Sequence, residues 1–105
     1  MQRDNNRLLL ELEKHRREIN RETIHPSMCT VDVDTLLPIV KICAKARASY
    51  IECLTALSNN NNESGPTAKQ IDQLKQFRIT YEELVRAANA LETIIDRGYV
   101  DAKES

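Results

Sequence analysis

The longest apolar stretch of the chain, residues 36–57, constrains its fold more than any other feature. It reads LLPIVKICAKARASYIECLTAL and contains only four charged residues. Its apolar residues recur every three or four positions, as on one side of a helix, and they form two adjoining stripes. One stripe comprises Leu36, Val40, Cys43, Arg47, Tyr50, Leu54 and Leu57, and the other comprises Ile39, Ile42, Ala46, Tyr50, Cys53 and Leu57. Two stripes are wider than one helical seam, so we expect a central helix covered on more than one side.

The composition points to helices and away from sheets. The 105 residues include three Tyr, one Phe, no Trp and only two Gly, and strands are usually rich in aromatic residues and bounded by turn formers. Leu, Ala, Glu, Lys, Arg and Gln, which favour helices, are plentiful. We therefore predict an all-α protein with three helices, and a single domain over residues 1–105.

The net charge and the cysteine content limit the cellular location and the binding partners that this chain can have. The net charge of −1 gives no overall attraction to nucleic acid or to anionic lipid. Three Cys are an odd number, so we expect small buried thiols and a reducing compartment. No apolar run is long enough to span a membrane, and the first residues are too polar for a secretory signal. These features predict an intracellular, cytoplasmic protein, with a nuclear location as the alternative.

Residues 3–24 predict an amphipathic helix with a short coiled-coil pattern. Its a and d positions hold Asn5, Leu8, Leu12, His15, Ile19 and Glu22, so aliphatic residues fill only the middle of the seam. Acidic and basic residues three or four apart support the opposite face. About 20 residues with one good turn of leucines make a marginal helix in isolation, so this helix needs a partner from its own chain or from another.

Residues 25–33 are predicted to connect the first helix to the second. His25-Pro26 ends the first helix, because proline disfavours helical conformation at the residue before it. The two valines of the connector either anchor it on the bundle, which we favour, or form a short extended piece. Asp32 or Asp34 is the expected N-cap of the central helix. If Asp34 caps, Pro38 falls in the first turn; if the helix starts at Asp32, Pro38 should kink it.

The second half of the chain predicts a long antiparallel helical hairpin, residues 34–58 and 67–97. Residues 58–66, SNNNNESGP, form its flexible loop, and Thr67 with Gln70 fits a capping box. The third helix carries the clearest stripe: Ile71, Leu74, Phe77, Tyr81, Leu84, Ala88, Leu91 and Ile95. It is longer than the central helix, so one end should overhang, or the helix should break near a second capping box at Thr80. Residues 99–105 should be a frayed tail.

Residue patterns for catalysis or metal binding are weak. The sequence contains no Gly-rich phosphate loop, G-x-S-x-G, H-E-x-x-H or C-x-x-C. His25 and Cys29 have metal-ligand spacing, but Pro26 lies between them, and further ligands would have to come from elsewhere. We therefore expect no catalytic residue, no cofactor, no metal and no small-molecule substrate. Arg47 interrupts the central stripe, either with its stem packed on the helix and its guanidinium in solvent, or in a charge pair at an interface.

The leading hypothesis is a helical protein–protein interaction and oligomerisation module of a larger scaffold, cytoskeletal, trafficking or regulatory protein. The apolar stripes exceed what three short helices can hide from one another, so we expect a homodimer or another helical oligomer. The alternative is a nucleic-acid-associated or transcription-regulatory dimerisation module that uses the basic residues of the first helix, although glutamates neutralise that helix. The expected partner-binding residues are Leu8, Leu12, His15, Ile19, Arg47, Leu91 and Ile95.

Overall fold

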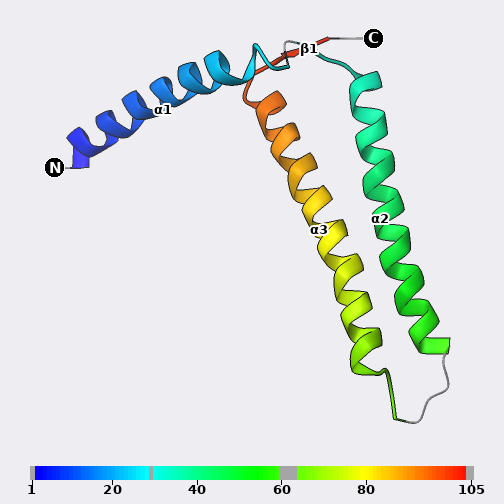
Figure 1. The fold of residues 1–105 in the computed structure, drawn as a ribbon. Coiled ribbons are helices and arrows are strands. Elements are labelled where there is room, and N and C mark those ends of the chain that lie inside the picture. The colour runs from blue at the N-terminus through cyan, green and yellow to red at the C-terminus, as the bar shows by residue number, and fades with distance from the viewer. Residues whose placement is uncertain (1, 29, 60–63, 104–105) are drawn as a thin grey trace. The chain divides into compact units, whose positions relative to one another are not determined.

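The computed structural model describes residues 2–28, 30–59 and 64–103. Within these ranges the chain forms three long helices and two very short strands (Figure 1). In chain order the elements are α1 (Gln2–Ile24), β1 (Thr30–Val31), α2 (Val33–Asn59), α3 (Ala68–Asp96) and β2 (Asp101–Ala102). The prediction of a three-helix, all-α arrangement is confirmed, with helix bounds within one or two residues of those expected.

The chain divides into two compact units. Unit 1 combines Met1–Thr35 with Leu91–Ser105, and unit 2 is Leu36–Ala90. Unit 1 therefore holds α1, both strands and the ends of α2 and α3, whereas unit 2 is the helical hairpin alone. Each unit has its own packing.

The hairpin consists of α2 and α3, which run antiparallel and pack against each other (Figure 1). The helices contain 27 and 29 residues, or about 40 and 44 Å at 1.5 Å per residue. The predicted overhang of α3 beyond α2 is wrong, because α2 extends past its apolar stretch at both ends and is only two residues shorter than α3. The alternative, a break at Thr80, is also wrong: α3 is continuous, and the Thr80 hydroxyl donates to the Gln76 carbonyl at 3.1 Å.

A single seam joins the two helices of the hairpin. The half-buried residues repeat with alternating steps of three and four, as in a two-stranded coiled coil. On α2 they include Leu36, Ile39, Cys43, Ala46, Tyr50, Cys53 and Leu57, and on α3 they include Gln70, Leu74, Phe77, Tyr81, Leu84 and Ala88. Gln70 takes the position that the sequence stripe assigned to Ile71, which is exposed. No described residue of α2 or α3 is fully buried, so α2 is covered on one side rather than on several.

Local side-chain bonds set the starts of α2 and α3. Oδ1 of Asp32 accepts bonds from the backbone N–H and the hydroxyl of Thr35, both at 2.9 Å. The N–H bond, then the hydroxyl bond, lowers the pKa of Asp32. Asp32 is thus the N-cap, and Pro38 lies inside α2, where it cannot donate to the Asp34 carbonyl.

The predicted capping box at the start of α3 is confirmed. The N–H of Gln70 donates to the Thr67 hydroxyl at 3.1 Å, and the N–H of Thr67 donates to the Gln70 side chain at 2.8 Å. Each side chain therefore satisfies an amide that the helix itself leaves without a partner. Helix α2 extends to Asn59, so the first two residues of the predicted loop are helical; residues 60–63 lie outside the described residues.

The end of α3 turns the chain back toward β1. Gly98 has a φ of +73°, a value that residues other than glycine rarely adopt. The N–H of Tyr99 bonds to the Ile94 carbonyl at 2.9 Å, and that of Gly98 bonds to Ile95 at 3.1 Å. These two bonds form a Schellman motif, which closes a helix and redirects the chain.

The predicted frayed tail is instead the centre of unit 1, up to Lys103. Strand β2 pairs in parallel with β1, Thr30 opposite Asp101, and the Lys103 N–H donates to the Val31 carbonyl at 2.8 Å. Val31, Tyr99 and Val100 are the only buried apolar residues in the described part of the chain. Of the two valines of the connector, Val31 is buried and lies in β1, so the less favoured alternative of a short extended piece is confirmed there, whereas Val33 is exposed on α2.

Candidate protein-binding surfaces

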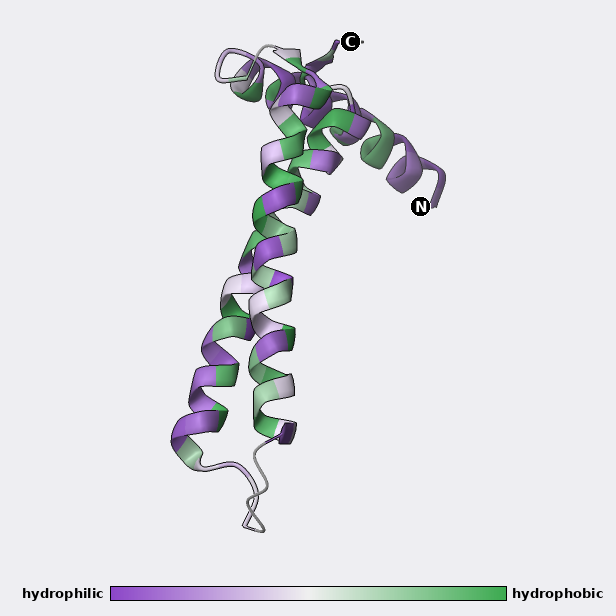
Figure 2. Cartoon of the chain, turned by 90° about the vertical axis from the view of Figure 1, so that its right-hand side faces the viewer, coloured by the Kyte–Doolittle hydropathy of each residue, from purple (hydrophilic) through white to green (hydrophobic). Residues whose placement is uncertain are grey.

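The predicted seam of α1 is open to solvent. We call Leu8, Leu12, His15 and Ile19 the α1 seam. Leu8, Leu12 and Ile19 are 65%, 47% and 60% exposed, and His15 is exposed with Nδ1 3.9 Å from a carboxylate oxygen of Glu18. In Figure 2, apolar bands interrupt the polar surface of α1. Nothing in the described part of the chain covers these side chains, so they are available to a second polypeptide.

Contacts of α1 within unit 1 use a different side of the helix. Its half-buried residues, Glu13, Asn20 and Ile24, lie on one face. At 3.6 residues per turn, this face points roughly 135° away from the α1 seam. The seam is therefore not a surface that α1 needs for its own fold.

Three charged or polar side chains fasten the end of α1 to β2. Arg21 donates to the Gly98 carbonyl at 2.7 Å and to the Asp101 carboxylate at 2.9 Å. Nε2 of His25 lies 3.0 Å from the other Asp101 oxygen. Hydrogen bonds from His25 and then from Arg21 lower the pKa of Asp101. We call Arg21, His25 and Asp101 the clasp; sequence reasoning missed it because Asp101 lies 80 and 76 positions from its two partners.

Beside the clasp, Tyr99 carries a polar group into the core of unit 1. Its hydroxyl is buried and has no hydrogen-bond partner of good geometry among the described residues. It nevertheless lies close enough to Arg97 to raise the pKa of that guanidinium above its usual value. Arginine is charged at any physiological pH, so this shift has no functional consequence.

A second apolar surface runs along α2 outside the hairpin seam. We call Leu37, Val40, Ala44, Ile51 and Leu54 the outer stripe of α2; all five side chains are exposed. They also follow helical spacing, with Arg47 in the gap between Ala44 and Ile51. Figure 2 shows apolar positions around both helices of the hairpin and not only between them. The outer stripe of α2 is therefore a candidate contact surface.

Arg47 is exposed yet bonds across the hairpin to α3, a contact that neither sequence-based interpretation anticipated. Its Nε and Nη2 atoms donate to the Tyr81 hydroxyl of α3 at 3.0 and 2.7 Å. The guanidinium carbon is 5.3 Å from the centre of the Tyr81 ring, which stacks on Tyr50 with ring centres 6.2 Å apart. Arg47 therefore stabilises the pairing of α2 with α3, and its charge is not matched by a glutamate.

The two remaining predicted contact residues, Leu91 and Ile95, are less accessible than the α1 seam. Both are half-buried and continue the heptad spacing of α3. The structure therefore groups Leu8, Leu12, His15 and Ile19 on one surface and does not place Arg47, Leu91 or Ile95 there.

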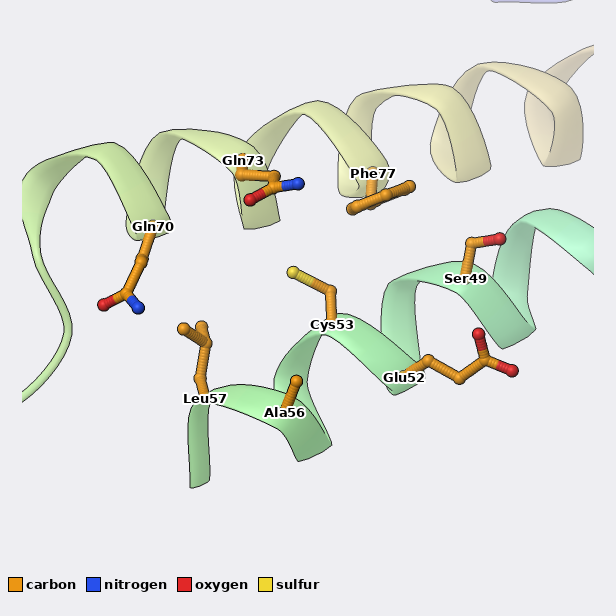
Figure 3. Close-up of a pocket in the computed structure, with 8 residues that line it drawn as sticks. All are labelled: Ser49, Glu52, Cys53, Ala56, Leu57, Gln70, Gln73 and Phe77. Carbon is orange, nitrogen blue, oxygen red and sulfur yellow. The ribbon is translucent and has the colours of Figure 1, made fainter. Parts of the chain in front are cut away.

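An open hollow of about 390 Å³ lies between α2 and α3 near the loop end of the hairpin (Figure 3). The Cys53 thiol points into it between Gln73 and Phe77 (Figure 3). Its other lining residues are Ser49, Glu52, Ala56, Leu57 and Gln70. No histidine, lysine or arginine lines the hollow, so no general base there could activate the Cys53 thiol as a nucleophile.

The geometry of the described residues gives little support to a metal-binding or a nucleic-acid-binding function. No three His, Cys, Asp or Glu side chains of the described residues gather at a possible metal position, and Cys29 lies outside those residues. Of the basic residues considered for phosphate contacts, Arg16 and Arg17 lie 2.6 and 3.7 Å from Glu13, and Arg21 pairs with Asp101. These cations are already partly neutralised.

Two further searches give negative results. Across the described residues, none of the helices combines the length and the apolarity that crossing a bilayer requires. Comparison with protein-family models, curated proteins and solved structures finds no match. The fold and its surfaces therefore define a class, all-α proteins built on a helical hairpin with an added amphipathic helix, and a functional hypothesis must come from the surfaces themselves.

Proposed function

We propose that this chain is a non-catalytic helical module for protein–protein interaction and oligomerisation, part of a scaffold, cytoskeletal, trafficking or regulatory protein. The observation that carries the proposal is the open α1 seam, where Leu8, Leu12 and Ile19 are each about half exposed or more. Exposure of these leucines to water is unfavourable. A second helix that covered the seam would gain about 25 cal/mol of free energy per Å² of apolar surface buried.

The outer stripe of α2 supports the same proposal independently. A helix with apolar residues on two sides is typical of a bundle, and α3 covers only one side of α2. Large contiguous apolar surfaces on soluble proteins commonly mark interaction sites. The nucleic-acid alternative has no comparable support, because three of its candidate arginines have acidic neighbours.

Sedimentation equilibrium over a wide range of protein concentration tests the proposal. We expect the purified chain to self-associate, and we expect Leu12→Gln to weaken the association by about tenfold, in line with the loss of one apolar side chain from an interface. Leu10→Gln is a matched control, because Leu10 is 73% exposed but points away from the α1 seam. A chain that stays monomeric at millimolar concentration would refute self-association.

A further inference from the structure

We infer that the α1 seam binds α1 of a second copy of this chain in parallel orientation, as a two-stranded coiled coil. The inference rests on the proposed function and deepens it by naming the partner and the direction of pairing. Its basis is the charge pattern that flanks the seam, together with the free face of α1.

A second helix can reach the seam without displacing the contacts that hold α1 in unit 1, although Arg16 would exchange its exposed bond to Glu13 for one to the second copy. The bonds from Arg21 and His25 to the C-terminal segment come from the helix end, and the half-buried side of α1 is Glu13, Asn20 and Ile24. Both lie away from Leu8, Leu12 and Ile19. Pairing therefore requires no unfolding of unit 1.

The two flanks of the seam carry different charges. In heptad terms, with Leu8 and His15 at d, the g positions are Asp4, Glu11 and Glu18, all acidic. The e positions are Leu9, Arg16 and Thr23, whose only charge is positive. One edge of the seam is thus an acidic line, and the other is neutral apart from Arg16.

These flanks distinguish parallel from antiparallel pairing. In a parallel coiled coil each g residue meets the e residue five positions further on in the partner, so Glu11 faces Arg16 of the second copy, twice by symmetry. In the antiparallel dimer that aligns Leu8 with Ile19 of the second copy, g meets g, and Glu11 faces Glu18 twice. The parallel dimer therefore brings opposite charges together across the seam, whereas the antiparallel dimer brings like charges together.

The seam residues support the same orientation. Parallel pairing places Asn5, an a-position residue, opposite Asn5 of the second copy, and a single Asn at an a position favours a two-stranded, in-register coil. Leu8, Leu12 and Ile19 then supply three matched apolar layers. Glu22 would face Glu22, so the paired stretch ends after Ile19.

Charge reversals on α1 test the orientation by sedimentation equilibrium at about 50 mM salt. Glu11→Lys should raise the dimer dissociation constant about fivefold, because the introduced ammonium would face Arg16 in both symmetry-related pairs. Glu18→Lys should change it less than about twofold, since its parallel neighbour is the uncharged Thr23. The Glu11→Lys effect should shrink at about 1 M salt, where charges are screened.

Each contrary result has a distinct meaning. If both reversals tighten the dimer, pairing is antiparallel and the inference is wrong. If the wild type dimerises but Glu11→Lys and Leu12→Gln leave it unchanged, the proposed function survives and the α1 seam is not the contact. A monomeric wild type overturns this inference and, in the proposed function, refutes self-association. Circular dichroism of each variant shows whether α1 remains helical, which separates a charge effect from unfolding.

Discussion

At the level of single residues, unit 1 depends on one exposed carboxylate. Asp101 receives bonds from Arg21 and His25 of the α1 end, and the three make the clasp that holds α1 to β2. Because both bonds favour the ionised form, they lower the pKa of Asp101 below its ordinary value of 3.8. A carboxyl with a lowered folded-state pKa stabilises the fold above its unfolded pKa and loses that contribution as pH falls through the folded value.

We therefore expect acid to destabilise unit 1 partly through Asp101. Between pH 6 and pH 2 the melting temperature of the wild type should fall more than that of Asp101→Asn, and most of the difference should be lost below pH 3.8, the ordinary value. Thermal denaturation at each pH measures this. The Asp32 cap shifts in the same direction but is present in both proteins, so the difference curve isolates Asp101. Parallel curves for the two proteins would contradict the prediction.

Residue-level features were predictable from the sequence only when their partners were close in the chain. The Asp32 cap and the Thr67–Gln70 box each join residues three positions apart; the box was predicted, and Asp32 was one of two candidate caps. The bond from Arg47 to Tyr81 spans 34 positions, and that from His25 to Asp101 spans 76. No local pattern specifies such pairs, and neither was found.

At the level of elements, the three helices were predicted, β1 matches only the less favoured interpretation of the connector as a short extended piece, and β2 was missed. Three long periodic segments gave α1, α2 and α3 to within a residue or two, because apolar spacing persists over many turns. Strands β1 and β2 contain two residues each, too few for an alternating pattern to stand out. Tyr99 and Val100 are residue types that are common in strands and in cores. The prediction that they form a frayed tail is wrong because Val31, beside which they are buried, is remote in the sequence.

The one-sided cover of α2 should be visible in the stability of the hairpin. We expect Ile39→Ala to lower the free energy of unfolding by about 1–3 kcal/mol, because Ile39 is half-buried in the seam. Ile51→Ala, the same change on the exposed outer stripe, should cost less than about 0.5 kcal/mol at concentrations where the chain is monomeric. Urea denaturation followed by circular dichroism compares them. Equal losses would mean that the outer stripe is covered.

For the whole molecule, the central question is what α1 gains from a second chain. His15 occupies a d position between Leu12 and Ile19, and a polar residue in such a seam lowers the stability of the assembly. The open α1 seam therefore contains one position where association can be strengthened, as well as several where it can be weakened.

His15→Leu should tighten self-association by about tenfold or more, because it adds an apolar layer to the pairing. Lys14→Leu is the matched control: it adds the same side chain at a neighbouring exposed position that does not face the seam. Sedimentation equilibrium measures both variants. If the two variants tighten association equally, the gain comes from non-specific hydrophobic association and not from pairing through the α1 seam.

The pairing of β2 with β1 has one more consequence. Tyr99 and Val100, two of the three buried apolar residues described, follow the last turn of α3. A premature stop codon or a carboxypeptidase that removed the chain beyond Arg97 would delete them along with Asp101, and Val31 would lose its cover. The sequence of the hairpin would be untouched, yet the N-terminal helix would lose its attachment to the chain's other end, so a very small truncation would have an effect out of proportion to its size.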